Sequence, residues 1–131
     1  NNKIIIEKMM KAVLFVSHGS RITETKTEVK RLVDILKKKS SLPIFEYAFL
    51  EIESPSIPEG IDMCVQKGAT QIVILLNFFN TGRHVGLDIP RIVKEAQKKY
   101  PFLKFKITEP LGQHPGMIDL FLGMIRNEKF F

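Results

Sequence analysis

The sequence predicts an α/β fold, a three-layer α/β/α sandwich built on a four-stranded parallel sheet. Four short runs rich in Val, Ile, Leu and Phe, at residues 11–17, 44–50, 71–78 and 104–108, are bounded by Gly, Pro or Ser. Such runs are typical of parallel strands that are buried on both faces. Four segments of helical period alternate with them. Because crossovers between parallel strands are short and right-handed, this order predicts a parallel sheet with helices on both faces.

Each helical segment carries four apolar residues at positions i, i+3, i+4 and i+7, the spacing of one helix face. We therefore expect four amphipathic helices, each following a strand. In chain order, the four sets are Val29, Leu32, Val33, Leu36; Ile57, Gly60, Ile61, Cys64; Ile89, Ile92, Val93, Ala96; and Ile118, Phe121, Leu122, Ile125.

Residues that start or stop helices mark the ends of these segments. Ser56 and Pro58 suit the start of the second helix, and Gly68 suits its end. Pro90 suits the first turn of the third helix, and Pro101 stops it. The end signals therefore agree with the apolar pattern.

The composition is that of one globular domain, with 131 residues, 44% of them hydrophobic and 26% charged. We assign residues 11–126 to this domain and residues 1–10 to an N-terminal extension. The single cysteine, Cys64, excludes an internal disulfide and any CxxC motif, which predicts a reducing compartment, the cytoplasm by default. No apolar run approaches the ~20 residues that a spanning helix needs, so no membrane partner is expected.

The net charge of +6 favours an anionic partner, such as nucleic acid, acidic lipid or a polycarboxylated small molecule. The lysines at 37–39 and 98–99 lie at predicted helix ends, where they complement the helix dipole and say little about a substrate. No RNP-like aromatic motif supports RNA binding, and we expect no nucleic-acid partner. Motifs for dinucleotide binding, nucleoside triphosphate hydrolysis and the hydrolase nucleophile elbow are absent from the sequence.

Polar residues that follow the predicted strands form the candidate site. His18 follows the first strand, Glu51 the second and His84 the third, and Glu51 lies midway between the two histidines in the sequence. Parallel sheets bind ligands beyond the carboxyl ends of their strands, so these side chains can converge. Two imidazoles and a carboxylate suit Fe, Co, Ni or Zn, and an incomplete ligand set leaves room for exchange. Neutral imidazoles can also accept protons near pH 7.

Structural roles compete with this metal-site hypothesis. A lone histidine after a strand is more often a turn or capping residue than a ligand. Glu51 could simply begin a polar loop that contains Glu53. For His114, before the last helix, a local role at the helix start is favoured. The joint placement of His18, Glu51 and His84 favours the metal site.

Two arginines flank the candidate histidines. Arg21 and Arg83 could bind carboxylates of an anionic substrate through their guanidinium groups. With Ser20, which precedes Arg21, they are the predicted substrate-binding residues. The apolar residues of the same region, Phe78, Phe79, Val85 and Leu87, could wall a cleft.

At these residues the sequence resembles the class II tetrapyrrole chelatases, specifically the small single-domain sirohydrochlorin chelatases of the short CbiX and SirB type. The resemblance extends from Lys11 to Ile125. Its landmarks are VSHGSR at 16–21, AFLE at 48–51, PSIP at 55–58, GAT at 68–70, GRHV at 82–85, DIP at 88–90 and PLGQHP at 110–115. Several ordered motifs at matching spacing are more specific than any one of them.

The resemblance implies an activity and a site. In this family Co²⁺, Fe²⁺ or Ni²⁺, as substrate, is inserted into sirohydrochlorin without nucleotide hydrolysis, in cobalamin or siroheme biosynthesis, and no permanent cofactor is needed. His18 and His84 match the metal-binding and proton-accepting histidines, and Glu51 matches an acid that some members place beside them. Larger relatives carry two such domains, which implies a symmetric homodimer for a chain with one.

Two other functions remain open at this point. A metal or tetrapyrrole carrier could use the same histidines without accelerating insertion. Ser17-His18-Gly19 superficially resembles the Arg-His-Gly of histidine phosphatases, although Ser17 stands where that chemistry needs a phosphate-binding arginine.

Overall fold

A four-stranded parallel sheet forms the centre of the molecule in the computed structural model, which describes residues 9–131. The strands are β1 (Lys11–Ser17), β2 (Ile44–Phe49), β3 (Gln71–Leu76) and β4 (Lys104–Ile107), in the order β2-β1-β3-β4. The predicted strands are confirmed, although three of them end one or two residues earlier than expected. Ends of elements commonly differ by this much.

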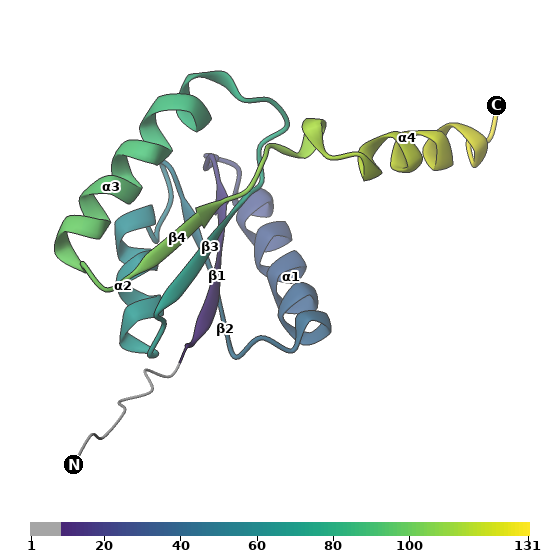
Figure 1. The fold of residues 1–131 in the computed structure, drawn as a ribbon. Coiled ribbons are helices and arrows are strands. Elements are labelled where there is room, and N and C mark those ends of the chain that lie inside the picture. The colour runs from purple at the N-terminus through teal and green to yellow at the C-terminus, as the bar shows by residue number, and fades with distance from the viewer. Residues whose placement is uncertain (1–8) are drawn as a thin grey trace, which may run out of the picture.

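Three of the four helices cover the sheet. One face carries α1 (Thr23–Ser40), whereas α2 (Ile57–Gln66) and α3 (Ile89–Lys99) lie together on the other face (Figure 1). The predicted α/β sandwich is therefore confirmed. In α1 the predicted face is only partly buried, because Val29 and Val33 reach the core while Leu32 is 43% exposed.

The larger core lies between the sheet and α2 with α3. All four residues of the predicted α2 face are buried, and three of them, Ile57, Ile61 and Cys64, belong to this core. The helix starts with a capping box, in which the Ser56 hydroxyl accepts from the Glu59 N–H and the Glu59 carboxylate accepts from the Ser56 N–H. Packing and capping thus fix α2 in the same position.

The last helix, α4 (Gly116–Arg126), does not pack on the sheet. Figure 1 shows it extending away from the body of the molecule. Within the described part of the chain, no residue of α4 is buried, and Ile118, Phe121, Leu122 and Ile125 are all exposed. The predicted helix forms, but its apolar face has no cover in a single described chain.

The segment before α4 fixes its direction. In the short 3-10 turn at Leu111–Gln113, Leu111 N donates to Phe78 O at 2.8 Å and Gly112 N donates to Phe79 O at 2.9 Å. The Gln113 side chain donates to Thr81 Oγ1 at 2.8 Å. The base of α4 is therefore attached to the loop that follows β3.

The assignment of residues 11–126 to one domain stays a prediction. Most of the predicted N-terminal extension, residues 1–10, lies outside the described residues. Among the helices that the structure describes, none has the length and apolarity needed to cross a membrane.

Candidate metal centre

Three predicted ligands meet at the carboxyl edge of the sheet. One ligand atom from each of His18, Glu51 and His84 lies within 4.8 Å of the other two. The three side chains are 44%, 51% and 45% exposed, so the cluster is open on one side. An open group of two imidazoles and one carboxylate can hold a divalent ion while leaving positions for exchange.

The loops after β1 and β2 run side by side, which brings His18 and Glu51 together. The parallel pairing continues beyond the strands, since Leu50 N donates to Ser17 O at 2.8 Å and Glu51 N donates to His18 O at 3.0 Å. Gly19 makes this approach possible because a Cβ added there would lie 1.9 Å from Glu51 O. Its φ of +106° is also a conformation that favours glycine.

His18 faces the carboxylate directly. Its Nε2 lies 2.8 Å from Glu51 Oε1, and its Nδ1 lies 3.2 Å from Gly19 O. A carboxylate oxygen and a ring nitrogen at 2.8 Å need a shared proton or a cation between them, because both are otherwise acceptors. A metal ion that binds here therefore takes the place of a proton.

His84 reaches the cluster from the other side. It begins a π-helical turn, His84–Asp88, which leads directly into α3. Its ring centroid lies 5.1 Å from that of His18, with the planes tilted by 53°. Its Nδ1 lies 2.8 Å from Asp88 Oδ2, so the carboxylate occupies this nitrogen and leaves Nε2 for a ligand. The i, i+4 spacing within a helical segment could have identified Asp88 from the sequence.

The predicted substrate-binding residues lie beside the cluster. Ser20 N donates to Glu53 Oε1 at 2.8 Å, and Ser20 Oγ accepts from Ile22 N at 3.0 Å. Arg21 is exposed and lines a hollow of about 360 Å³ together with Ser20, Lys26 and Glu53. Arg83 is exposed and immediately precedes His84. Both guanidinium groups are thus free to approach a ligand from solvent.

The third histidine serves the start of α4. His114 is exposed, and its Nδ1 accepts from Gly116 N at 2.9 Å. It is not part of the group formed by His18, Glu51 and His84. This contact is the local role that the sequence favours.

The residues that could wall a cleft divide into two pairs. Val85 is buried in the core, and Phe78 packs against the core with its ring nearly perpendicular to that of His18 at a centroid distance of 6.5 Å. Phe79 and Leu87 are at least half exposed. Of these four residues, Phe79 and Leu87 therefore offer the most apolar surface to a ligand, and Val85 does not.

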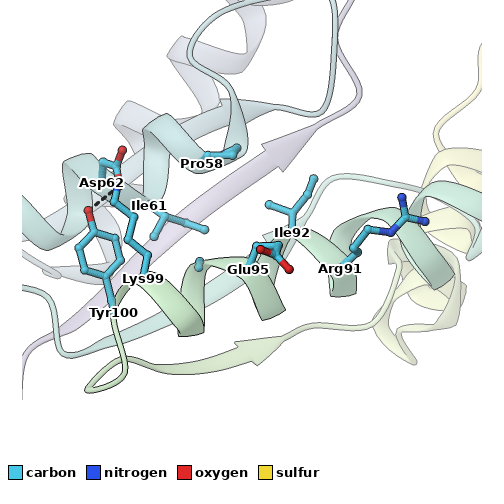
Figure 2. A pocket seen from close by; sticks show the side chains of 9 residues that line it. Pro58, Ile61, Asp62, Arg91, Ile92, Glu95, Lys99 and Tyr100 are labelled. Carbon is cyan, nitrogen blue, oxygen red and sulfur yellow. Dashed lines mark hydrogen bonds and ion pairs between the residues drawn. The ribbon is translucent and has the colours of Figure 1, made fainter.

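An apolar groove of about 290 Å³ lies elsewhere, between α2 and α3 (Figure 2). Asp62 of α2 accepts hydrogen bonds from Tyr100 Oη at 2.6 Å and Lys99 Nζ at 3.1 Å at one end of it. The Tyr100 hydroxyl in the first place, and then Lys99, hold the pKa of Asp62 below its usual value. The groove contains none of the predicted site residues.

The single cysteine also lies away from the site. Cys64 is fully buried in α2, and burial raises the pKa of its thiol to about 12. A protonated, buried thiol is a core residue rather than a metal ligand.

Comparison with known proteins gives a family match over most of the chain. The model of the family described as CbiX matches residues 12–128. The chain is 36% identical to the sirohydrochlorin ferrochelatase of Arabidopsis thaliana chloroplasts over 108 residues, which are 82% of this chain and 48% of that protein. It is also 36% identical to the sirohydrochlorin cobaltochelatase of Sulfolobus acidocaldarius, over 85% of this chain and 86% of that protein.

A solved structure is similar in fold. The sirohydrochlorin chelatase SirB from Bacillus subtilis subspecies spizizenii, in complex with cobalt, superposes with a TM-score of 0.82 and 29% identity. The match covers 91% of this chain and 51% of that one. The chain thus spans about half the length of the plant relative and of SirB, but most of the length of the archaeal relative.

Proposed function

The chain belongs to the CbiX family, and from that premise we propose that it inserts a divalent metal ion into sirohydrochlorin. The observation that carries this proposal is the convergence of His18, Glu51 and His84 at the carboxyl edge of the sheet. The names of the relatives supply the substrate, and the cluster supplies groups with the right chemistry for it. The activity is that of a lyase, with Co²⁺, Fe²⁺ or Ni²⁺ as the metal substrate.

Metal insertion requires an exchange of protons for a cation. The ion loses water ligands and forms bonds to the four ring nitrogens, and two pyrrole N–H protons leave, so that one divalent ion replaces two protons. His18, Glu51 and His84 would hold the ion in place of water, and neutral imidazoles beside the ring would accept the protons. The contact between His18 Nε2 and Glu51 Oε1 at 2.8 Å supports this role, because two such acceptors need a proton between them, at a position that a cation could take.

The substrate carries carboxylates on its periphery, which suits the basic surroundings of the cluster. We assign Arg21 and Arg83 to these carboxylates and Ser20 to the same region of contact. Guanidinium groups bind carboxylates through paired hydrogen bonds. The net charge of +6 would also attract a polyanion over a longer range.

The exposed face of α4 supports a homodimer. Its apolar side chains, from Ile118 to Ile125, form a stripe without cover in the described chain, and its base is fixed to the loop after β3. A second copy is the occupant that we propose for this stripe. Its support is that the region matched in SirB is about half of that chain, which leaves a length there for a second unit of the same size.

Sedimentation velocity over a range of protein concentrations tests the homodimer. Ile125→Glu should shift the protein toward the monomer, because a charge would enter the apolar stripe. Ile35→Glu, on an exposed position of α1, is the matched control. A monomeric wild type at all concentrations, or equal behaviour of both variants, would overturn the proposal.

An anaerobic absorbance assay with sirohydrochlorin tests the activity. We expect wild-type protein to accelerate insertion of at least one of Co²⁺, Fe²⁺ and Ni²⁺ over a protein-free control. His18→Ala and His84→Ala should each lower the rate by 100-fold or more, as loss of positioned ligands and proton acceptors does. His114→Ala, the third histidine, is the matched control and should retain the wild-type rate.

A carrier would give a different result in the same assay. It would bind metal or tetrapyrrole stoichiometrically without insertion faster than in the control, and saturating metal would restore the histidine variants. That outcome would overturn the chelatase proposal. Location in the cytoplasm stays a prediction from the single cysteine, and a permanent cofactor is not part of the proposal.

A further inference from the structure

The side chain of Asp88 is bound to a candidate metal ligand rather than to its own helix. Asp88 Oδ2 lies 2.8 Å from His84 Nδ1. Asp88 occupies the N-cap position of α3, yet its side chain makes no capping hydrogen bond there. Its other contact, with Arg91, is 3.9 Å long and exposed, and such surface pairs contribute little. The interaction with His84 is therefore the main one that this carboxylate makes.

The chemistry of the pair determines which nitrogen of His84 carries the proton. A carboxylate only accepts hydrogen bonds, so Nδ1 must donate to Asp88. In a neutral ring, Nε2 then holds the lone pair. His84 is thus set in advance with one nitrogen tied back and the other available to an ion.

The other histidine of the cluster is held differently. His18 Nδ1 lies 3.2 Å from the carbonyl oxygen of its neighbour Gly19, and its Nε2 contacts Glu51 Oε1 at 2.8 Å. An ion must displace the proton of this second pair. His84 lacks that obstacle at Nε2, because its carboxylate partner is bound at Nδ1.

We propose that Asp88 is a positioning residue for His84. It holds the imidazole in the Nδ1–H tautomer and directs Nε2 toward the position shared with His18 and Glu51. This inference rests on the proposed function, in which the cluster receives a divalent ion. Carboxylates bound to metal-ligating histidines commonly account for 10- to 100-fold of metal affinity.

The experiment measures the tautomer and the metal affinity separately. Long-range ¹H–¹⁵N NMR of the metal-free protein at a pH where His84 is neutral should show the Nδ1–H tautomer for wild type. Asp88→Ala should lose this preference and bind Co²⁺ about 10- to 100-fold more weakly in an anaerobic absorbance titration. Asp88→Asn keeps an amide oxygen that accepts from Nδ1, so it should retain the tautomer and recover part of the affinity.

A matched control separates positioning from charge. Glu95→Ala removes the same charge from an exposed position of α3, where Glu95 pairs with Lys98, and should bind Co²⁺ as wild type does. The inference is overturned if Asp88→Ala binds Co²⁺ within twofold of wild type, or if it keeps the Nδ1–H tautomer. It is also overturned if Glu95→Ala loses as much affinity as Asp88→Ala.

Neither measurement uses a tetrapyrrole, so the two proposals can fail separately. If wild type fails to insert metal but the Asp88 variants change the tautomer and the affinity as expected, the positioning role stands and the chelatase proposal falls. If insertion depends on both histidines but Asp88→Ala changes neither quantity, the positioning role falls alone.

Discussion

Helices α2 and α4 carry the same apolar pattern and lie in opposite environments. In α2, the face residues Ile57, Ile61 and Cys64 are at most 1% exposed, and Gly60 is buried as well. The corresponding residues of α4 are 37% to 71% exposed. An amphipathic pattern therefore predicts a helix and its apolar face, but not which surface covers that face.

Local contacts account for the difference. Gly60 lets α2 lie directly on the sheet, because a Cβ added there would be 2.8 Å from a Leu14 methyl and 3.0 Å from Ala48 Cβ. By contrast, the 3-10 turn before α4 is bonded to Phe78, Phe79 and Thr81, which directs α4 away from the body of the molecule. The close approach at Gly60 in α2 and the bonded turn before α4, rather than the shared apolar spacing, decide where each helix lies.

The largest expected difference between the two helices is in the stability lost when one isoleucine of each is truncated. Ile61→Ala should lower the free energy of unfolding by about 2–5 kcal/mol, because it leaves a cavity in the core. Ile125→Ala in dilute protein should change it by less than about 0.5 kcal/mol, as exposed substitutions do. Urea denaturation measures both values. Equal losses would contradict the comparison by showing that α4 is covered within one chain.

A second pair of substitutions should change stability in opposite directions. Gly60→Ala adds a methyl group to a filled contact, and overpacking of about 1–3 kcal/mol should exceed the gain in helix propensity of about 1 kcal/mol. Gly123→Ala adds a methyl group where no atom outside its own helix backbone lies within 4 Å. Only the gain in helix propensity then applies, so this variant should be more stable. Urea denaturation and far-ultraviolet circular dichroism test this pair. Destabilisation by Gly123→Ala would show that a neighbour fills that space.

The capping box should contribute a smaller difference. Ser56→Ala removes the hydroxyl that accepts from Glu59 N and should cost about 1 kcal/mol. Pro115 occupies the N-cap position of α4 but makes no side-chain capping hydrogen bond. Pro115→Ala therefore removes no such bond and should cost less stability than Ser56→Ala. Thermal unfolding of the two variants measures the difference. A larger loss for Pro115→Ala would refute this view of the two helix starts.

The smallest expected effect is on the pH dependence of stability, and it comes from the hydrogen bonds that join Asp62 of α2 to Lys99 and Tyr100 at the end of α3. Hydrogen bonding by Tyr100, followed by Lys99, lowers the pKa of Asp62, so the folded state favours the charged carboxylate. Its contribution is complete above the unfolded pKa of about 3.9 and is lost as the pH falls through the lower folded value. Tyr100→Phe should therefore be less stable than wild type at pH 7, and the gap should narrow below about pH 4. A gap that stays constant with pH would contradict this role of Asp62.

Most of the fold and the three clustered residues could be predicted from the sequence because both follow from chain order. Parallel strands carry the residues after them to one edge, so His18, Glu51 and His84 had to meet there. Two features could not be predicted in this way. The direction of α4 depends on hydrogen bonds from Leu111, Gly112 and Gln113 to a distant loop, which the apolar pattern does not encode. The proposed role of Asp88 depends on a contact with His84 that the i, i+4 spacing allows but does not fix, because the contact also needs a particular rotamer within a π-helical turn.

The attachment of α4 to residues 78–81 has a thermodynamic consequence. The same loop continues into His84, so the proposed second copy on α4 and the proposed ion in the cluster would act on one continuous segment. Any factor by which the ion tightens association of two copies must equal the factor by which association tightens binding of the ion. Under the two proposals, the oligomeric state would therefore depend on free metal concentration wherever that factor differs from one.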